Sequence, residues 1–156
     1  MKLFKSFGYA FRGIYTCLCL EQNFRIHITA VVTVLLFARF YGLPLDKYPP
    51  ILLVMALVLG MEALNTAVEQ LVDLASPQKS SLARIAKDVA AAGVLLGALG
   101  SVAIAALIFS DIEGWLRILD RLQSPAFILG LMLYILFFWG FVFRFPVKPK
   151  TKEEMK

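Results

Sequence analysis

The chain has 156 residues, of which 60% are hydrophobic and only 17% are charged, and its mean hydropathy is +0.76. Soluble domains usually carry about 25% charged residues, and a single soluble domain of this size does not need so much apolar surface. The formal charge of +5 is therefore interpreted as a guide to membrane orientation, and nucleic-acid binding is not expected. These figures exclude an ordinary soluble domain and predict a small integral membrane protein.

Residues 1–27 are predicted to form an amphipathic helix at the membrane surface. Its large apolar residues recur at steps of three and four, which places them on one helical face: Phe4, Phe7, Phe11, Ile14 and Leu18. Aromatic anchors together with basic charge suit the headgroup layer. The two cysteines, Cys17 and Cys19, also lie here, and without a second pair they support neither a zinc site nor a disulfide framework.

Four apolar segments follow and are predicted to cross the membrane. They are residues 28–41, 50–75, 89–109 and 126–143. The connections are the proline-rich turn GLPLDKYPP (42–50), the polar loop SPQKSS (76–81) and a polar stretch at 110–124. This last stretch is predicted to form a short surface helix around Trp115. The expected fold is thus all-α: an interfacial helix, three spans, and a fourth span followed by a basic tail.

The distribution of positive charge predicts the orientation of the chain. Twelve of the 16 Lys and Arg residues lie before the first span, between the second and third, or after the fourth. The other side would hold only Arg39, Lys47, Arg117 and Arg121. Since segments rich in Lys and Arg stay in the cytoplasm, both termini are expected to be cytoplasmic.

A stripe of polar residues interrupts the second span, in GMEALNTAVEQLVD (60–73). At about 100° per residue, its members fall within an arc of about 100° and extend for about 16 Å along the helix: Glu62, Asn65, Thr66, Glu69 and Asp73. A charged residue at the centre of a bilayer costs about 2.5–3.5 kcal/mol on insertion scales. Polar contacts between helices would not need three acids. The stripe therefore predicts cation binding, proton transfer or catalysis.

A second group of charges narrows these possibilities. Lys87 and Asp88 open the third span, just across the loop from Asp73, while Glu21 and Arg25 lie just before the first span. Carboxylates that hold Mg²⁺, beside cations that neutralise phosphate, are what phosphoryl transfer requires. The soluble P-loop motif is absent from the sequence, since GALGS (97–101) lacks the lysine and lies in a span.

Two other functions remain open from the residues alone. A small cation or proton transporter would use the acidic stripe as its path, and it would depend neither on Lys87 nor on ATP. A non-enzymatic assembly module would use the polar residues only to bind helices, so that Glu62→Gln would leave its function intact.

The segments FGYAFRGI, EQNFRIH, EALNTAVEQLVD and AKDVAAAGV resemble, in order and spacing, the bacterial membrane-embedded diacylglycerol kinase and undecaprenol kinase family. The resemblance covers roughly residues 3–110. It implies a homotrimer in the bacterial inner membrane, with active sites shared between protomers. It also implies transfer of the γ-phosphate of MgATP to the hydroxyl of a lipid at the cytoplasmic surface.

The resemblance further implies roles for individual residues. Glu62 would accept the proton of the lipid hydroxyl, and Asn65 would position the reacting groups. Glu21 and Glu69 would hold the Mg²⁺ that bridges the phosphates of ATP. The other expected contributors to the nucleotide site are Tyr9, Arg25, Asp73, Lys87 and Asp88.

The sequence departs from the family at two places. Ala10 and Ala91 stand where some diacylglycerol kinases of the family carry Ser, and with the NFRIH string they favour the undecaprenol branch, although both lipids remain open. Residues 111–156, with the fourth span, lie outside the resemblance. The predicted division is therefore a lipid kinase domain at 1–110 and an additional span with a basic tail at 111–156.

Overall fold

The computed structural model describes residues 2–76, 78 and 80–144. These residues form six α-helices and one short 3₁₀ helix, and no strand occurs among them. The elements are α1 (Lys2–Leu20), α2 (Gln22–Tyr41), η1 (Leu45–Lys47), α3 (Tyr48–Ala75), α4 (Ser81–Ile108), α5 (Ile112–Arg121) and α6 (Pro125–Arg144). Within the described chain, α2, η1 with α3, α4 and α6 give four segments that are long and apolar enough to cross a membrane. The predicted all-α integral membrane fold is confirmed.

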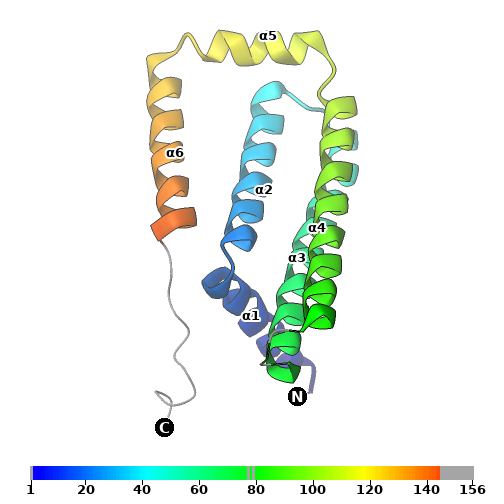
Figure 1. The fold of residues 1–156 in the computed structure, drawn as a ribbon. Coiled ribbons are helices and arrows are strands. Elements are labelled where there is room, and N and C mark those ends of the chain that lie inside the picture. The colour runs from blue at the N-terminus through cyan, green and yellow to red at the C-terminus, as the bar shows by residue number, and fades with distance from the viewer. Residues whose placement is uncertain (1, 77, 79, 145–156) are drawn as a thin grey trace.

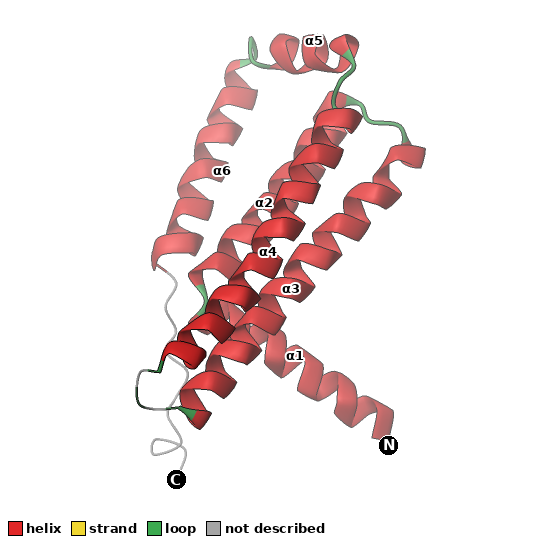
Figure 2. Ribbon diagram, turned by 45° about the vertical axis from the view of Figure 1, so that its right-hand side comes forward, coloured by secondary structure: helices red, strands yellow, loops and turns green. Residues whose placement is uncertain are grey.

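The four long helices run along one common direction, α5 lies across one end of them, and α1 leaves the other end at an angle (Figures 1 and 2). The most extensive packing is between α3 and α4. It is close because α4 presents glycines to α3. A Cβ on Gly93 would lie 3.0 Å from Cε of Met61, and one on Gly97 would lie 3.4 Å from Cγ2 of Val58.

The predicted surface helix is confirmed as α5, which is fixed to the end of α2. The side chain of Asp111 accepts hydrogen bonds from the first backbone N–H groups of α5 and so caps the helix. The Tyr41 hydroxyl donates to the Asp111 carbonyl at 2.5 Å, and Nε of Arg117 donates to the Tyr41 carbonyl at 2.8 Å. Gly114 lies against the Tyr41 ring, which leaves no room for a Cβ.

The fourth span packs on α2 of the same chain. The hydroxyls of Thr33 and Tyr134 are 2.6 Å apart, and the rings of Phe40 and Phe127 form an edge-to-face pair with centroids 5.1 Å apart. These contacts show where α6 lies, a question that the sequence left open.

The helix boundaries correct the prediction in two places. The helix expected over 1–27 ends at Leu20, because Glu21 has extended backbone angles (φ −110°, ψ 116°) and α2 then begins at Gln22. The apolar periodicity gave no sign of this break, since Glu21 is followed by residues that suit a helix equally well. The helix of the third span begins at Ser81, ahead of the expected start at residue 89, because the charged residues there extend the helix beyond its apolar part.

Candidate functional site

The most buried polar residues of the described chain belong to the deeper part of the polar stripe. Glu62, Asn65 and Thr66 are 1%, 6% and 4% exposed, so their predicted common face is buried. The Thr66 hydroxyl donates to the Glu62 carbonyl at 3.0 Å. Oε1 of Glu62 and Oδ1 of Asn65 are buried and have no hydrogen-bond partner among the described residues. Because buried polar atoms are costly to leave unpaired, these two oxygens are candidate contacts for a bound group.

The break between α1 and α2 brings a third carboxylate to this face. Glu21 lies within electrostatic range of both Glu69 and Glu62. The pKa of Glu21 is raised from its ordinary value, chiefly by burial and further by the negative charge of Glu69, while the positive charge of Arg25 opposes the shift. The structure thus brings Glu21, Glu62, Asn65 and Glu69 into one acidic cluster.

Cys17, one helical turn before Glu21, also contacts the acidic cluster. The residue is 7% exposed. The pKa of this thiol is raised by burial, whereas a hydrogen bond with the Thr66 side chain lowers it in part. Cys17 is not among the site residues predicted from the sequence. Its i, i+4 spacing to Glu21, which puts both residues on one face of a continuous helix, was the available signal.

The donors of the acidic cluster suit a hard cation. The described residues contain no group of three or more His, Cys, Asp and Glu side chains arranged to hold a metal ion. Mg²⁺, however, is commonly bound through one or two carboxylates together with substrate phosphates. Glu21 and Glu69 provide such a pair, and the unpartnered oxygens of Glu62 and Asn65 are further oxygen donors nearby. The chemistry of these donors is therefore compatible with Mg²⁺, which Glu21 and Glu69 would hold.

Asp73, at the end of the stripe, faces α4 instead of the acidic cluster. Nζ of Lys87 donates to Oδ1 of Asp73 at 2.6 Å, and both side chains are partly exposed, at 34% and 63%. Lys87 thus pairs with Asp73, and the neighbouring Asp88 lies 3.9 Å from Nε of Arg84. Lys87 and Asp88 are adjacent on the helix, so their side chains point in different directions.

The two remaining predicted site residues lie in contrasting surroundings. Tyr9 is 63% exposed, and its ring lies 4.8 Å below the guanidinium of Arg12. Arg25 is buried, and it donates to the carbonyls of Leu18 at 2.7 Å and Val142 at 3.2 Å. Neither residue bonds to a side chain of the acidic cluster within one chain.

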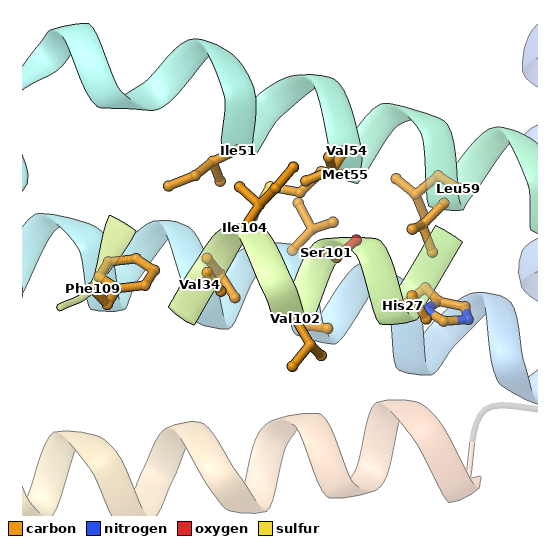
Figure 3. A pocket seen from close by; sticks show the side chains of 15 residues that line it. His27, Val34, Ile51, Val54, Met55, Leu59, Ser101, Val102, Ile104 and Phe109 are labelled. Carbon is orange, nitrogen blue, oxygen red and sulfur yellow. The ribbon is translucent and has the colours of Figure 1, made fainter. Parts of the chain in front are cut away.

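An apolar cavity of about 260 Å³ lies between α2, α3 and α4. His27 and Leu59 lie at one end of it and Phe109 at the other (Figure 3). Val58 and Leu59 line the cavity, and Glu62 follows them by about one helical turn on α3. The cavity therefore leads along α3 toward the acidic cluster.

The fold and the site define a small polytopic membrane protein with an acidic site between the α1–α2 break and the middle of α3, beside an apolar cavity. The chain belongs to the prokaryotic diacylglycerol kinase family, whose model matches residues 8–109. It is therefore a lipid kinase, a phosphotransferase with an alcohol group as acceptor. The family predicted from the sequence is confirmed.

Two relatives are named for different lipids, one for undecaprenol and the other for diacylglycerol. The chain is 38% identical over 108 residues to the undecaprenol kinase of Bacillus subtilis, a match that covers 69% of this chain and 88% of the relative. It is 40% identical over 103 residues to a diacylglycerol kinase of Synechocystis sp., where 65% of this chain and 59% of the relative are covered. No solved structure matches the chain.

Proposed function

We propose that this lipid kinase transfers the γ-phosphate of MgATP to the hydroxyl of diacylglycerol or undecaprenol at the cytoplasmic face of the bacterial inner membrane. The observation that carries the proposal is the burial of Glu62 beside two further carboxylates, with one oxygen unpartnered. The acidic cluster lies beside the α1–α2 break, on the half of α3 that leads to the end of the bundle where α4 begins (Figure 1). That end also carries Lys5, Arg12, Arg84 and Lys87, which supports cytoplasmic termini.

Glu62 is the residue best placed to take the proton of the lipid hydroxyl. It is the deepest acid of the stripe, so it meets a hydroxyl that arrives from the bilayer, and a positioned carboxylate typically contributes about 10²–10⁴-fold as a general base. Asn65 holds Glu69 through a hydrogen bond of 3.0 Å, and Glu69 with Glu21 would hold Mg²⁺. When bound, Mg²⁺ neutralises the charge that develops on the transferring phosphoryl group.

The nucleotide is expected at the water-facing side of the acidic cluster. Lys87 and Asp73 are partly exposed there, and an ammonium beside the phosphates would stabilise their charge. Tyr9 and Asp88 are exposed and lie outside the acidic cluster. Their predicted contact with the nucleotide is best explained by a homotrimer in which a neighbouring copy completes each site. For Arg25, the bonds to Leu18 and Val142 favour a positioning role in place of contact with the nucleotide.

The apolar cavity gives the hydrocarbon of the lipid a place close to Glu62. Its lining is almost entirely apolar, with His27 and Ser101 as the polar exceptions, so it suits a hydrocarbon chain. Relatives of both names are similar to this chain, and the departures at Ala10 and Ala91 favour undecaprenol. We therefore expect the greater activity with undecaprenol.

The decisive assay follows radiolabelled phosphate from ATP into lipid. The purified chain in lipid nanodiscs receives MgATP with either diacylglycerol or undecaprenol. The parent should label lipid, and Glu62→Gln should lose about 10²-fold or more of that activity, since Gln cannot accept the proton. Glu113→Gln, an exposed acid on α5 at the other end of the molecule, is the matched control. A parent that labels neither lipid would contradict the proposed substrates, and an active Glu62→Gln would remove Glu62 from the role of base.

A further inference from the structure

One buried guanidinium joins two helices, α1 and α6. Arg25 is 7% exposed; its Nη1 donates to the Leu18 carbonyl at 2.7 Å and its Nε to the Val142 carbonyl at 3.2 Å. Leu18 belongs to the last turn of α1, and Val142 lies in α6. Carbonyls in the last turn of a helix lack intrahelical partners and carry partial negative charge. Arg25 therefore caps the end of α1 and at the same time bonds to the backbone of α6.

The same residue lies one turn after the break that carries Glu21. Its backbone N–H donates to the Glu21 carbonyl at 3.4 Å, and its charge acts on the Glu21 carboxylate. The extended backbone at Glu21 is flanked by two helices that Arg25 ties together. The position of this carboxylate thus depends on the bonds that Arg25 makes.

Helix α6 is the other partner of this bridge and lies outside the segment that matches the family, residues 8–109. It is attached to α2 at two further points, Thr33 with Tyr134 and Phe40 with Phe127. Both of these lie farther along α2 from the acidic cluster than Arg25 does. Among the contacts described between α2 and α6, the Arg25–Val142 bond therefore lies nearest to the acidic cluster.

We propose that Arg25 is a positioning residue through which α6 holds the α1–α2 break, and with it Glu21, in the geometry required for phosphoryl transfer. The inference rests on the proposed function, which places Glu21 in the site. Arg suits this role because its planar fork donates to two carbonyls in fixed directions, whereas the single ammonium of Lys does not reproduce that geometry. The additional span then supports the reaction without contacting the substrate.

Arg25→Lys tests the role of the guanidinium while keeping the charge. A small misplacement of a catalytic group can cost roughly 10²-fold in rate, so kcat should fall roughly 10- to 100-fold, with KM for MgATP changed less than about twofold. Arg39→Lys, an exposed arginine near the other end of the same helix, is the matched control and should retain the parent activity. A variant that raises KM for MgATP with kcat unchanged would show direct contact with the nucleotide and overturn the proposal.

Combining substitutions in α6 with Arg25→Lys tests whether α6 acts through Arg25. The variant Phe127→Ala/Tyr134→Phe lacks the two outer attachments of α6, so amide hydrogen exchange in this helix should rise. These substitutions should lower kcat in the parent but have little further effect in Arg25→Lys, because residues that act through one contact are not additive. If hydrogen exchange in α6 rose while kcat stayed unchanged, the proposal would be contradicted. It would also be contradicted if the losses of kcat from the α6 substitutions and from Arg25→Lys were fully additive.

Hydrogen exchange separates this inference from the proposed function. In Arg25→Lys, exchange should rise in the segments around residues 18–24 and 138–143, but not in α5. This result does not require turnover, so it tests the bridge even if the parent labels no lipid. Exchange that is unchanged in both segments would show that Arg25 does not hold the two helices.

Discussion

The side-chain amide of Asn65 donates a hydrogen bond to Oε1 of Glu69 at 3.0 Å, one turn farther along α3. The bond restrains the Glu69 carboxylate on the side of the helix where Glu21 lies within electrostatic range. It also uses the amide nitrogen of Asn65 and leaves Oδ1 buried without a partner among the described residues. Asn65 therefore holds the expected metal ligand, Glu69, and is buried on the same helix as the expected base, Glu62.

Asn65→Leu should impair catalysis more than folding. A hydrogen bond to a charged group contributes about 1.5–3 kcal/mol, so kcat/KM should fall roughly 10- to 100-fold, and a higher concentration of Mg²⁺ should be needed for half-maximal rate. Initial rates measured across a Mg²⁺ titration check both effects. Gln70→Leu, an exposed amide on the same helix, should behave like the parent. A variant with the parent's Mg²⁺ requirement would argue against the proposed role of Asn65.

Removal of divalent cations should abolish the activity reversibly. The acidic cluster has only oxygen donors, and two carboxylates of the protein would share Mg²⁺ with the phosphates of ATP. EDTA should therefore stop lipid labelling, and added Mg²⁺ should restore it. Glu69→Gln should raise the Mg²⁺ requirement, because one anionic ligand is lost. Full activity in the presence of excess EDTA would contradict the metal assignment.

The Lys87–Asp73 pair gives a different kind of prediction. Both side chains are partly exposed, and exposed ion pairs contribute little to stability. Lys87→Met should therefore leave the melting temperature nearly unchanged but raise KM for MgATP, as expected if the ammonium contacts the nucleotide. Thermal unfolding and ATP titrations measure the two effects separately, and Lys47→Met at the other end of the molecule is the control. A lowered melting temperature with unchanged KM would indicate a structural role only.

The sequence was sufficient to predict the spans and the buried stripe for clear physical reasons. Long apolar segments can be satisfied only by crossing lipid or by entering a large core, and helical periodicity alone places Glu62, Asn65 and Thr66 on one face. The structure confirms their burial. It also shows that Asp73, at the edge of the same arc, turns to Lys87 of α4.

The break at Glu21 and the bridge at Arg25 could not be predicted in the same way. No Gly or Pro marks the break, so the sequence favoured one continuous helix. The bond from Arg25 to Val142 joins residues far apart in the chain, and no local pattern specifies such a contact. The family resemblance suggested a nucleotide contact for Arg25, but it does not extend to α6, where Val142 lies.

Gly114→Ala should destabilise the attachment of α5. A Cβ at this position would overlap the ring of Tyr41, and overpacking of this kind typically costs about 1–3 kcal/mol. The melting temperature in detergent should fall. Gly100→Ala, where a Cβ would meet nothing within 4 Å, should leave it unchanged or slightly raised, since Ala favours a helix. Equal stability of the two variants would contradict the close packing of α5 on α2.

The reactivity of Cys17 should report whether α1 is docked on the acidic cluster. Because only the thiolate is alkylated, the raised pKa of Cys17 means a smaller thiolate fraction at pH 8 than in an ordinary thiol, and burial hinders the reagent further. In a Cys19→Ser background, iodoacetamide should therefore react with Cys17 at least roughly tenfold more slowly than with glutathione. The rate should continue to rise as the pH increases beyond the range in which glutathione reaches its plateau. Thr66→Val removes the hydrogen bond that lowers this pKa, so it should shift the pH profile of alkylation to higher pH. If Cys17 in the parent reacted as fast as glutathione, α1 would not be docked on α3.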